Sequence, residues 1–451
     1  PLLEDPSATL DREALFFHYP HYYPTTTPVS AIRQGPWKLL HYYEEDLCEL
    51  YHLENDPSEQ SNLALQHPDR VKTMKEKLDR WRSKMGAQMP EKPATTDEPP
   101  RLWNESASLP RAADLPTLPG TRFHVIKRHE PDKDGYGFLH GLALAFHKGR
   151  LFASFGHNKG LENTGTEQAR WCVSEDLGRT WSEPQMIDPG SDDLAVSHGV
   201  FHRDGDTLWA FLGAFEGTRK NVRTRAYRFD DDNQQWISEG DVIGDGFWPM
   251  EEPRRLSNGN WLMSGLIVGK GNPPGVAITR GDDLTDWIVS KLKPAKPAKV
   301  WGESTTWLQD HRLVNVSRFG EQARALVAIS EDLGKTWSAP EPSNLPMVTS
   351  KPYAGRLRSG HAFLLGTSTA DSGHRRSPLT IAISPPGDST FNRVWTIREA
   401  VFPEGPGESH PGAALAYPYA IEHEENLYVA YSNNGGRKGH NLNSAELAVI
   451  P

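Results

Sequence analysis

The stretch Ser-Glu-Asp-Leu-Gly-Lys-Thr-Trp at residues 330–337 is repeated at residues 174–181, where the only change is Arg179 in place of Lys335. In such a pattern the Ser and Asp side chains bond the backbone of a turn, Gly occupies its positive-φ corner, and Trp packs beneath it. Two nearly identical copies indicate an internal repeat, and a repeat constrains the whole fold.

Weaker copies of the turn extend the repeat across the rest of the chain. The Trp residues that close the turns are spaced by 50 to 58 residues, and they are Trp181, Trp236, Trp287, Trp337 and Trp395. A strand precedes each turn, as at 224–228, 275–279 and 379–383. A hairpin precedes each such strand and occurs once more near the end of the chain. The six predicted hairpins span 139–155, 197–213, 250–267, 304–318, 354–367 and 416–432.

The sixth hairpin is followed by one strand at 445–450 and by no further turn. A strand at 122–128 supplies the missing outer strand and removes an exposed sheet edge. The sequence therefore predicts a mainly β fold, with a six-bladed β-propeller over 121–451 closed by the strand at 122–128.

Residues 1–90 have a different pattern. Segments 31–33, 37–43 and 47–51 read as strands, and apolar residues recurring every three or four positions from Pro68 to near Gly86 predict an amphipathic helix. These features predict a small α+β subdomain over 1–90. Residues 91–120 contain six prolines among charged residues, so a Pro-rich linker is expected there.

Composition narrows the choice of partners. The chain has 451 residues and a net charge of −10, which disfavours nucleic acid, and it lacks the run of about 20 apolar residues that spans a membrane. Its two cysteines, Cys48 and Cys172, form neither a disulfide framework nor a metal motif, so no metal and no cofactor are expected. The first ten residues do not read as a signal peptide and suggest a fragment of a longer protein.

The first ninety residues resemble the C-terminal subdomain of type I sulfatases. The likeness rests on Ala-Ile-Arg-Gln-Gly-Pro-Trp-Lys-Leu at 31–39, on Glu-Leu-Tyr-His-Leu at 49–53 and on Asp-Pro-Ser-Glu at 56–59. The sulfatase nucleophile motif, Cys or Ser followed by x-Pro-x-Arg, does not occur in this sequence, and neither does the Asp-rich calcium site. Sulfatase activity is therefore not expected.

The repeated turn resembles the Asp box of the bacterial neuraminidase repeat, so residues 121–451 are similar to propellers of the sialidase superfamily. The resemblance implies that the Asp boxes are structural and lie on the outer side of the blades. It also implies that the protein is secreted or periplasmic.

In a propeller, the start of each hairpin and the end of its second strand face the same side, so the chemistry is expected to converge there. Carboxylates, histidines and tyrosines transfer protons. Arginines bind carboxylate or sulfate, and aromatic side chains stack on sugars. The candidate catalytic residues are Glu303, Glu252, Tyr419, His198, His140 and His157. The candidate substrate-binding residues are Arg318, Arg375, Arg376, Arg356, Lys351, Tyr353, Trp248, Asn158 and Arg437.

The sialidase resemblance implies roles for some of these residues. Sialidases bind the substrate carboxylate with three arginines, and Arg318 with Arg375 or Arg376 match two of them. A Tyr nucleophile assisted by Glu is matched by Tyr417 or Tyr419, with Glu303 or Glu252 beside it. Two positions depart from the pattern. The Arg-Ile-Pro entry is replaced by residues 125–129, and His157-Asn158 stands where an acid/base Asp is expected.

Three functions follow from this reading. The first is an exo-glycosidase acting on an acidic glycan that carries uronate, sialate or sulfate, with an acidic oligo- or polysaccharide as its partner. The second is a uronate lyase that uses His or Tyr as a base. The third is a glycan-binding propeller without catalysis.

Overall fold

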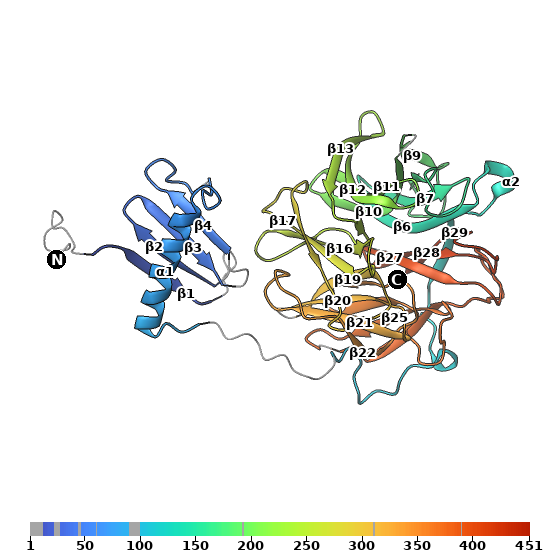
Figure 1. Ribbon diagram of the computed structural model, residues 1–451. Coiled ribbons are helices and arrows are strands. Elements are labelled where there is room, and N and C mark those ends of the chain that lie inside the picture. The colour runs from blue at the N-terminus through green and yellow to red at the C-terminus, as the bar shows by residue number, and fades with distance from the viewer. Residues whose placement is uncertain are drawn as a thin grey trace. The chain divides into compact units, whose positions relative to one another are not determined.

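The computed structural model describes residues 12–21, 28–43, 47–59, 61–89, 100–191, 194–309, 312–388 and 390–451. The chain divides into two compact units, 1–97 and 98–451, and each is considered separately (Figure 1). Among the described residues, no helix combines the length and apolar character needed to cross a membrane.

The first unit is a four-stranded antiparallel sheet with one helix. The sheet has the order β1-β2-β3-β4, and α1 packs on one face of it (Figure 1). The small core comprises Ile32, Leu39, Leu50, Met74 and Leu78. The elements are β1 (Leu15–Tyr19), β2 (Val29–Gln34), β3 (Trp37–Tyr42), β4 (Leu47–His52) and α1 (Pro68–Met85). The predicted strands and helix are confirmed, and β1 is an additional strand.

Among its described residues, the second unit contains six antiparallel sheets that follow one another along the chain. Two short helices precede the first sheet, η1 (Ala112–Asp114) and α2 (Pro131–Asp134). The first three sheets are β6 (Phe138–His147), β7 (Arg150–Asn158), β8 (Gln168–Ser174), β9 (Gln185–Asp188); β10 (Ala195–Asp204), β11 (Thr207–Glu216), β12 (Lys220–Asp230), β13 (Gln235–Ile243); and β14 (Phe247–Pro249), β15 (Arg254–Arg255), β16 (Trp261–Ile267), β17 (Pro274–Thr279), β18 (Trp287–Lys291).

The last three sheets have the same antiparallel plan. They are β19 (Val300–Gln309), β20 (Arg312–Phe319), β21 (Arg324–Ser330), β22 (Glu341–Pro346); β23 (Tyr353–Arg356), β24 (Ala362–Gly366), β25 (Leu379–Ser384), β26 (Arg393–Arg398); and β27 (Leu415–His423), β28 (Asn426–Asn433), β29 (Ser444–Ile450), β5 (Arg122–Lys127). The pairing of β5 with β29 confirms that the N-terminal strand of this region completes the last sheet.

Each sheet contacts the next in chain order, and the last sheet also contacts the first through β27 and β6. Aromatic contacts between these two strands fix their relative direction. The rings of His140 and Tyr417, near the strand starts, lie 3.9 Å apart, and those of Phe146 and His423, near the strand ends, lie 3.7 Å apart. The strands therefore run in the same direction, and residues at their starts gather at one end.

The repeated turns have the predicted internal bonds and join the third and fourth strands of their sheets. In residues 330–337, Ser330 Oγ donates to Asp332 Oδ1 at 2.7 Å, the Gly334 amide donates to Ser330 Oγ at 2.8 Å, and Trp337 Nε1 donates to the Gly334 carbonyl at 2.9 Å. Both Gly334 and Leu333 have positive φ. The turn is thus satisfied by its own groups, and its position on the outer strands keeps it away from the strand starts.

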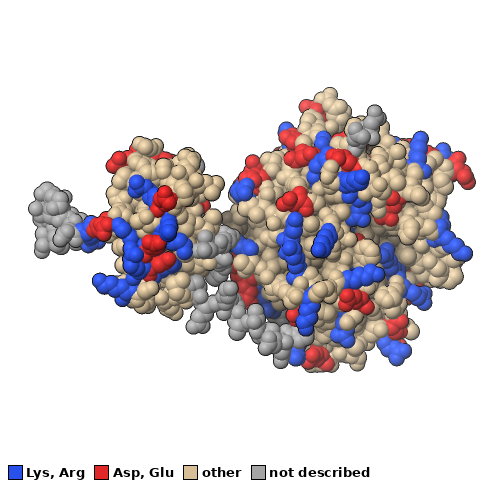
Figure 2. Space-filling model, in the orientation of Figure 1, with Lys and Arg blue, Asp and Glu red and all other residues tan. Residues whose placement is uncertain are grey.

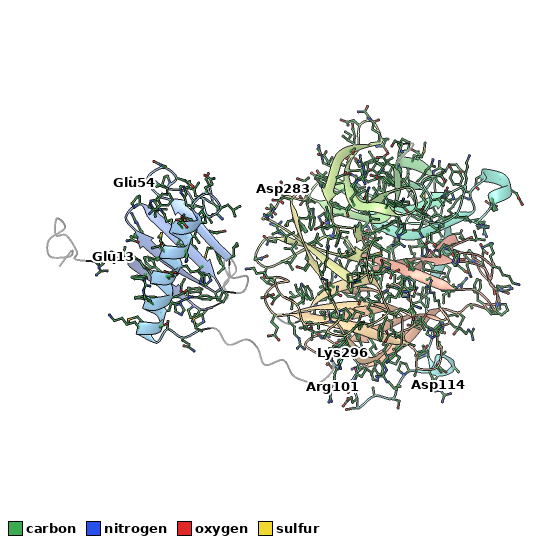
Figure 3. The ribbon with its side chains drawn as sticks, in the orientation of Figure 1. Glu13, Glu54, Arg101, Asp114, Asp283 and Lys296 are labelled. Carbon is green, nitrogen blue, oxygen red and sulfur yellow. The ribbon has the colours of Figure 1, made fainter. Side chains whose placement is uncertain are left out.

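The expected linker at 91–120 needs a correction. Residues 91–99 lie outside the described residues, but Leu102 and Trp103 are buried in a core of the second unit, and both of their amides donate to Asn344 Oδ1. Arg101 and Asp114, labelled in Figure 3, mark the start and the later part of this packed segment. Burial of these two large apolar side chains, with their backbone amides paired, stabilises a packed segment although its composition is rich in proline.

Candidate functional site

The site is organised by Glu303, near the start of β19. Its buried side chain accepts hydrogen bonds at a single oxygen, Oε1, from Tyr417 Oη at 2.5 Å and from Arg318 Nη1 at 2.7 Å. Arg318 Nη1 also lies 3.3 Å from Tyr417 Oη. The second carboxylate oxygen, Oε2, is buried without a hydrogen-bond partner. A phenol is therefore held against a carboxylate that has unused capacity to accept a proton.

Tyr417 has an unusual backbone conformation. Its φ is +54°, which is costly for a bulky residue, and the pairing of β27 with β28 shifts register between Ala416 and Tyr419. The resulting bulge re-aims the side chain. Burial, followed by the charge of Glu303, raises the pKa of the Tyr417 phenol, so it carries its proton at neutral pH.

Two arginines bring positive charge to this pair. The Arg376 guanidinium lies 5.9 Å from the centroid of the Tyr417 ring, and its Nε donates to the Thr349 carbonyl at 3.3 Å. Burial and then the neighbouring Arg318 disfavour the charge of Arg376, and its pKa is lowered, although Tyr417 and Glu303 act in the opposite sense. Two guanidiniums near one carboxylate favour an anionic ligand.

Basic side chains also stand out across the middle of the face of the second unit seen in Figure 2, although the whole chain is acidic.

The His140 ring contacts the Tyr417 ring, and His198 lies next to His140. His140 Nδ1 accepts from Asn443 Nδ2 at 3.3 Å and lies 3.1 Å from Ser432 Oγ, and the His140 and His198 rings are 6.1 Å apart. Burial lowers the pKa of His140 well below its usual value and lowers that of His198 to about 3. Both are therefore neutral at physiological pH and offer hydrogen bonds rather than charge.

A second carboxylate, Glu162, belongs to the loop between β7 and β8. It interacts electrostatically with Glu303 and with Arg376, which places it near the Tyr417 group. Burial raises the pKa of the Glu162 carboxyl, and Glu303 adds to the rise, while Asn441 and Arg219 oppose it. A carboxyl that holds its proton above the usual pH is suited to act as a general acid.

Lys351 lies beneath the site, buried in the segment before β23. Its Nζ donates to the Pro418 carbonyl at 3.1 Å, one residue beyond Tyr417. Its ammonium lies 5.5 Å from the Tyr353 ring centroid and 5.7 Å from that of Tyr419.

Glu252, Tyr353 and Tyr419 form a separate group around Arg254. Tyr353 Oη donates to both oxygens of Glu252 at 2.8 Å, and Arg254 Nη2 lies 3.5 Å from Glu252 Oε1. The Tyr353 and Tyr419 rings are 4.7 Å apart. Tyr419 and Glu252 line a cavity of about 230 Å³ together with residues near the ends of β6, β10 and β27. Glu252 and Tyr419 therefore face a cavity that Tyr417 does not line, and Tyr353 is bonded to Glu252.

Three more predicted residues have structural partners. His157 is stacked on Tyr136, with ring centroids 4.1 Å apart. Asn158 uses its side-chain amide on the Leu161 carbonyl and Thr164 Oγ1 and its oxygen on the Gly160 amide and Thr166 Oγ1. Trp248 is buried, and its Nε1 donates to the His198 carbonyl at 2.9 Å. Asn158 thus bonds its own loop, His157 is held by ring stacking, and the Trp248 ring lies 4.9 Å from the ring of His198.

Three predicted arginines also lie outside the group. Arg356 is at the end of β23 and donates to the Gly360 and Leu308 carbonyls. Arg437 is paired with Glu408. Arg375 is exposed, and its charge acts on Glu399. The structure thus brings together Glu303, Arg318, Arg376, His140, His198 and Lys351.

Of the two tyrosines, the candidate catalytic set from the sequence contained Tyr419 and not Tyr417, and Glu162 was given no role. The bulge explains the first choice, because strict alternation along β27 hides the register shift at Tyr417. Glu162 is in a loop, where spacing gives no facing information. Within the described ranges, no three His, Cys, Asp or Glu side chains are grouped in a way that could hold a metal ion.

Comparison with family models identifies both units. Residues 1–84 match the model described as N-sulphoglucosamine sulphohydrolase, C-terminal, and residues 198–429 match the BNR repeat-like domain. No curated protein matches the sequence.

Solved structures share the fold at low sequence identity. A protein of unknown function from Dyadobacter fermentans has a TM-score of 0.55 and 17% identity, covering 74% of this chain and 99% of its own. The Hadza microbial sialidase Hz136 has a TM-score of 0.55 and 12% identity, and the match covers 73% of this chain and 68% of the sialidase chain. The Trypanosoma rangeli sialidase has a TM-score of 0.50 and 15% identity, and the match covers 74% of this chain and 60% of the sialidase chain. With a sialidase-like fold and a family match over more than half of its length, the chain belongs to the BNR repeat-like domain family.

Proposed function

We propose that residues 121–451 form a six-bladed β-propeller and that this unit is an exo-glycosidase acting on an acidic glycan, with Tyr417 as its nucleophile. The observation that carries the proposal is the 2.5 Å hydrogen bond from Tyr417 Oη to Glu303, set beside the guanidiniums of Arg318 and Arg376. A nucleophile held by its base, with cations nearby, suits a sugar that carries a carboxylate or sulfate.

In the proposed reaction, the Tyr417 oxygen attacks the anomeric carbon as its proton passes to Glu303. The glycosidic bond breaks at the same carbon, and the leaving oxygen takes the proton of Glu162. Water then attacks the glycosyl–tyrosine bond, giving its proton to Glu162, while the Tyr417 oxygen recovers its proton from Glu303. Two displacements at one carbon retain its configuration. Arg318 and Arg376 hold the anionic group of the sugar throughout.

The test uses the full chain with 4-methylumbelliferyl glycosides of N-acetylneuraminic acid and of glucuronic acid, and with sulfated and unsulfated uronate oligosaccharides. We expect release of the terminal acidic sugar from at least one of them. A fluorinated glycosyl fluoride of that sugar should label the peptide containing Tyr417, detected by mass spectrometry, and Tyr417→Phe should remain unlabelled. A wild type that releases no sugar from the whole panel contradicts the glycosidase proposal.

A uronate lyase is the second candidate, and the contact between His140 and Tyr417 favours it. Neutral histidine and tyrosine in contact can take the proton beside a uronate carboxylate while Arg376 neutralises that carboxylate. The lyase product contains a double bond that absorbs in the ultraviolet. Sugar release without that absorbance excludes elimination. Glycan binding without any turnover would instead favour a binding propeller.

The first unit supports an acidic and sulfated glycan as the substrate class, because its family model comes from an enzyme that acts on N-sulphoglucosamine. We infer that it has no sulfatase activity of its own, since the nucleophile motif is missing from the sequence. A secreted or periplasmic location agrees with such a substrate. The test compares the location of the natively expressed protein with that of a reporter fusion that lacks a signal peptide.

A further inference from the structure

Lys351 is a buried lysine in the second unit, and its ammonium is hydrogen-bonded to the backbone. It is 3% exposed, and its ammonium donates to the Pro418 carbonyl at 3.1 Å. A buried ammonium is costly unless it is compensated. None of the roles proposed above for the reaction uses this side chain, so its position needs a separate explanation.

The carbonyl that Lys351 binds belongs to the bulge in β27. Ladder pairing with β28 is interrupted between Ala416 and Tyr419, which removes the usual sheet partner in this stretch. Tyr417, immediately before Pro418, has φ +54°. A strained conformation persists only when its surroundings fix it. The Lys351–Pro418 bond anchors the bulge at the residue that follows Tyr417.

Lys351 also sits among carboxylates and neutral aromatic groups from six inner segments. Burial lowers the pKa of Lys351 to about 8, although the three carboxylates raise it. The groups that face it are Glu251, Glu252, Glu303, Tyr353, Tyr419, His140 and His198, and Arg254 pairs with the first two carboxylates. Burial also raises the pKa of the Glu251 carboxyl to about 7, but in this set it is the Lys351 ammonium that is bonded to the bulge.

We propose that Lys351 is a positioning residue for Tyr417. Its ammonium holds the Pro418 carbonyl, keeps the bulge in place and supports the Tyr417–Glu303 pair with positive charge. The inference rests on the proposed role of Tyr417 for its catalytic meaning, but its structural core concerns the bulge alone. Loss of the ammonium proton should therefore disturb Tyr417 without unfolding the protein, because burial already favours the neutral lysine in the folded state.

The first experiment does not need activity. The full chain is labelled at the Cζ carbon of its 13 tyrosines, and the Tyr417 signal is assigned by its loss in Tyr417→Phe. In the wild type we expect this signal to shift with a midpoint near pH 8. Lys351→Met should displace the signal and abolish that midpoint. Lys351→Arg should abolish the midpoint, and its Tyr417 signal should stay at all pH values where the wild-type signal lies below pH 8, since arginine stays charged. The exposed Lys270→Met is the matched control and should titrate as the wild type does.

An identical Tyr417 titration in the wild type and in Lys351→Arg overturns the proposal, and this arm stands even if Lys351→Met does not fold. With a cleaved substrate, Lys351→Met should lower kcat at least about tenfold and change KM less than threefold. Wild-type kcat should fall above about pH 8, and Lys351→Arg should lose that limb. A wild type that cleaves nothing contradicts the proposed function but leaves the Tyr417 titration to decide the role of Lys351.

Discussion

The inner strands of the second unit carry two tyrosine–glutamate pairs, and the pairs differ in how far they are satisfied. Glu252 receives Tyr353 on both oxygens and has Arg254 nearby. Glu303 receives Tyr417 and Arg318 on one oxygen and leaves the other buried without a partner. Residue composition alone does not separate the two pairs.

The backbone separates them further. Tyr353 lies in regular pairing with Leu365, whereas Tyr417 lies in a bulge with positive φ. A complete hydrogen-bond set on regular backbone favours stability, while unused capacity on a strained backbone is typical of a site that changes protonation. The comparison predicts that the same chemical deletion has different consequences in the two places.

The largest difference is expected from removal of a phenol oxygen. Tyr417→Phe should lower kcat/KM at least about a thousandfold with little loss of stability, because it removes the proposed nucleophile. Tyr353→Phe should leave kcat/KM within about tenfold and cost roughly 1–3 kcal/mol of unfolding free energy, because it leaves Glu252 short of a donor. Kinetics and urea unfolding measure both. Equal kinetic losses in the two variants would remove the distinction.

The two arginine environments give the next effect. Arg376→Gln should raise KM for an anionic glycoside and lower kcat/KM about a hundredfold, because a buried cation near Tyr417 is lost. Arg356→Gln, which alters an arginine bonded to two carbonyls at the strand end, is the matched control and should change kcat/KM less than threefold. An anionic glycoside cleaved equally well by the wild type, Arg376→Gln and Arg356→Gln would argue against anion recognition by Arg376.

The proposed role of Glu162 as general acid predicts how kcat/KM depends on pH. Because the pKa of its carboxyl is raised, the protonated form persists above the usual range, and kcat/KM should fall as pH rises through that raised pKa. Glu162→Gln should lose this limb and retain more activity on aryl glycosides with good leaving groups than on oligosaccharides. An unchanged pH profile in Glu162→Gln would exclude it as the acid.

The smallest effect on activity is expected at the outer turns. Asp332→Ala removes bonds to Ser330 and Thr336 inside a buried turn and should cost about 1–3 kcal/mol of unfolding free energy. Asp283, labelled in Figure 3, is exposed and bonds only Thr285 within its weaker copy, so Asp283→Ala should cost less. Neither variant should change kcat/KM. A catalytic loss in Asp332→Ala would contradict a purely structural turn.

The sheets were predictable from local signals. Each hairpin has alternating apolar residues and a turn, and the spacing of Trp181 to Trp395 reports how often the unit repeats. The closing strand followed from a missing partner, which β5 supplies. The segment around Trp103 was not predictable, because its burial depends on Asn344, far away in sequence.

Glu303 and His140, predicted from the starts of regular strands, both contact Tyr417. Arg356 and Tyr419 lie farther along their strands, and a displacement of two or three residues moves a side chain by about 7–10 Å. The choice of Tyr417 over Tyr419 depends on a bulge, for which Pro418 within the strand is the sequence signal. Asn158 and Arg437 are polar residues whose hydrogen-bonding capacity is used by their own loops.

The pairing of β5 with β29 has a consequence for synthesis. Residues 122–127 leave the ribosome more than 300 residues before residues 445–449, which they pair with. Joining segments that far apart costs roughly 5 kcal/mol of chain entropy, which only the finished sheet can offset. The sixth sheet is therefore expected to form after the others, and a chain that stops before β29 would expose the edges of both β28 and β5. Such truncated products are expected to aggregate or be degraded, which makes this pairing a checkpoint on complete translation.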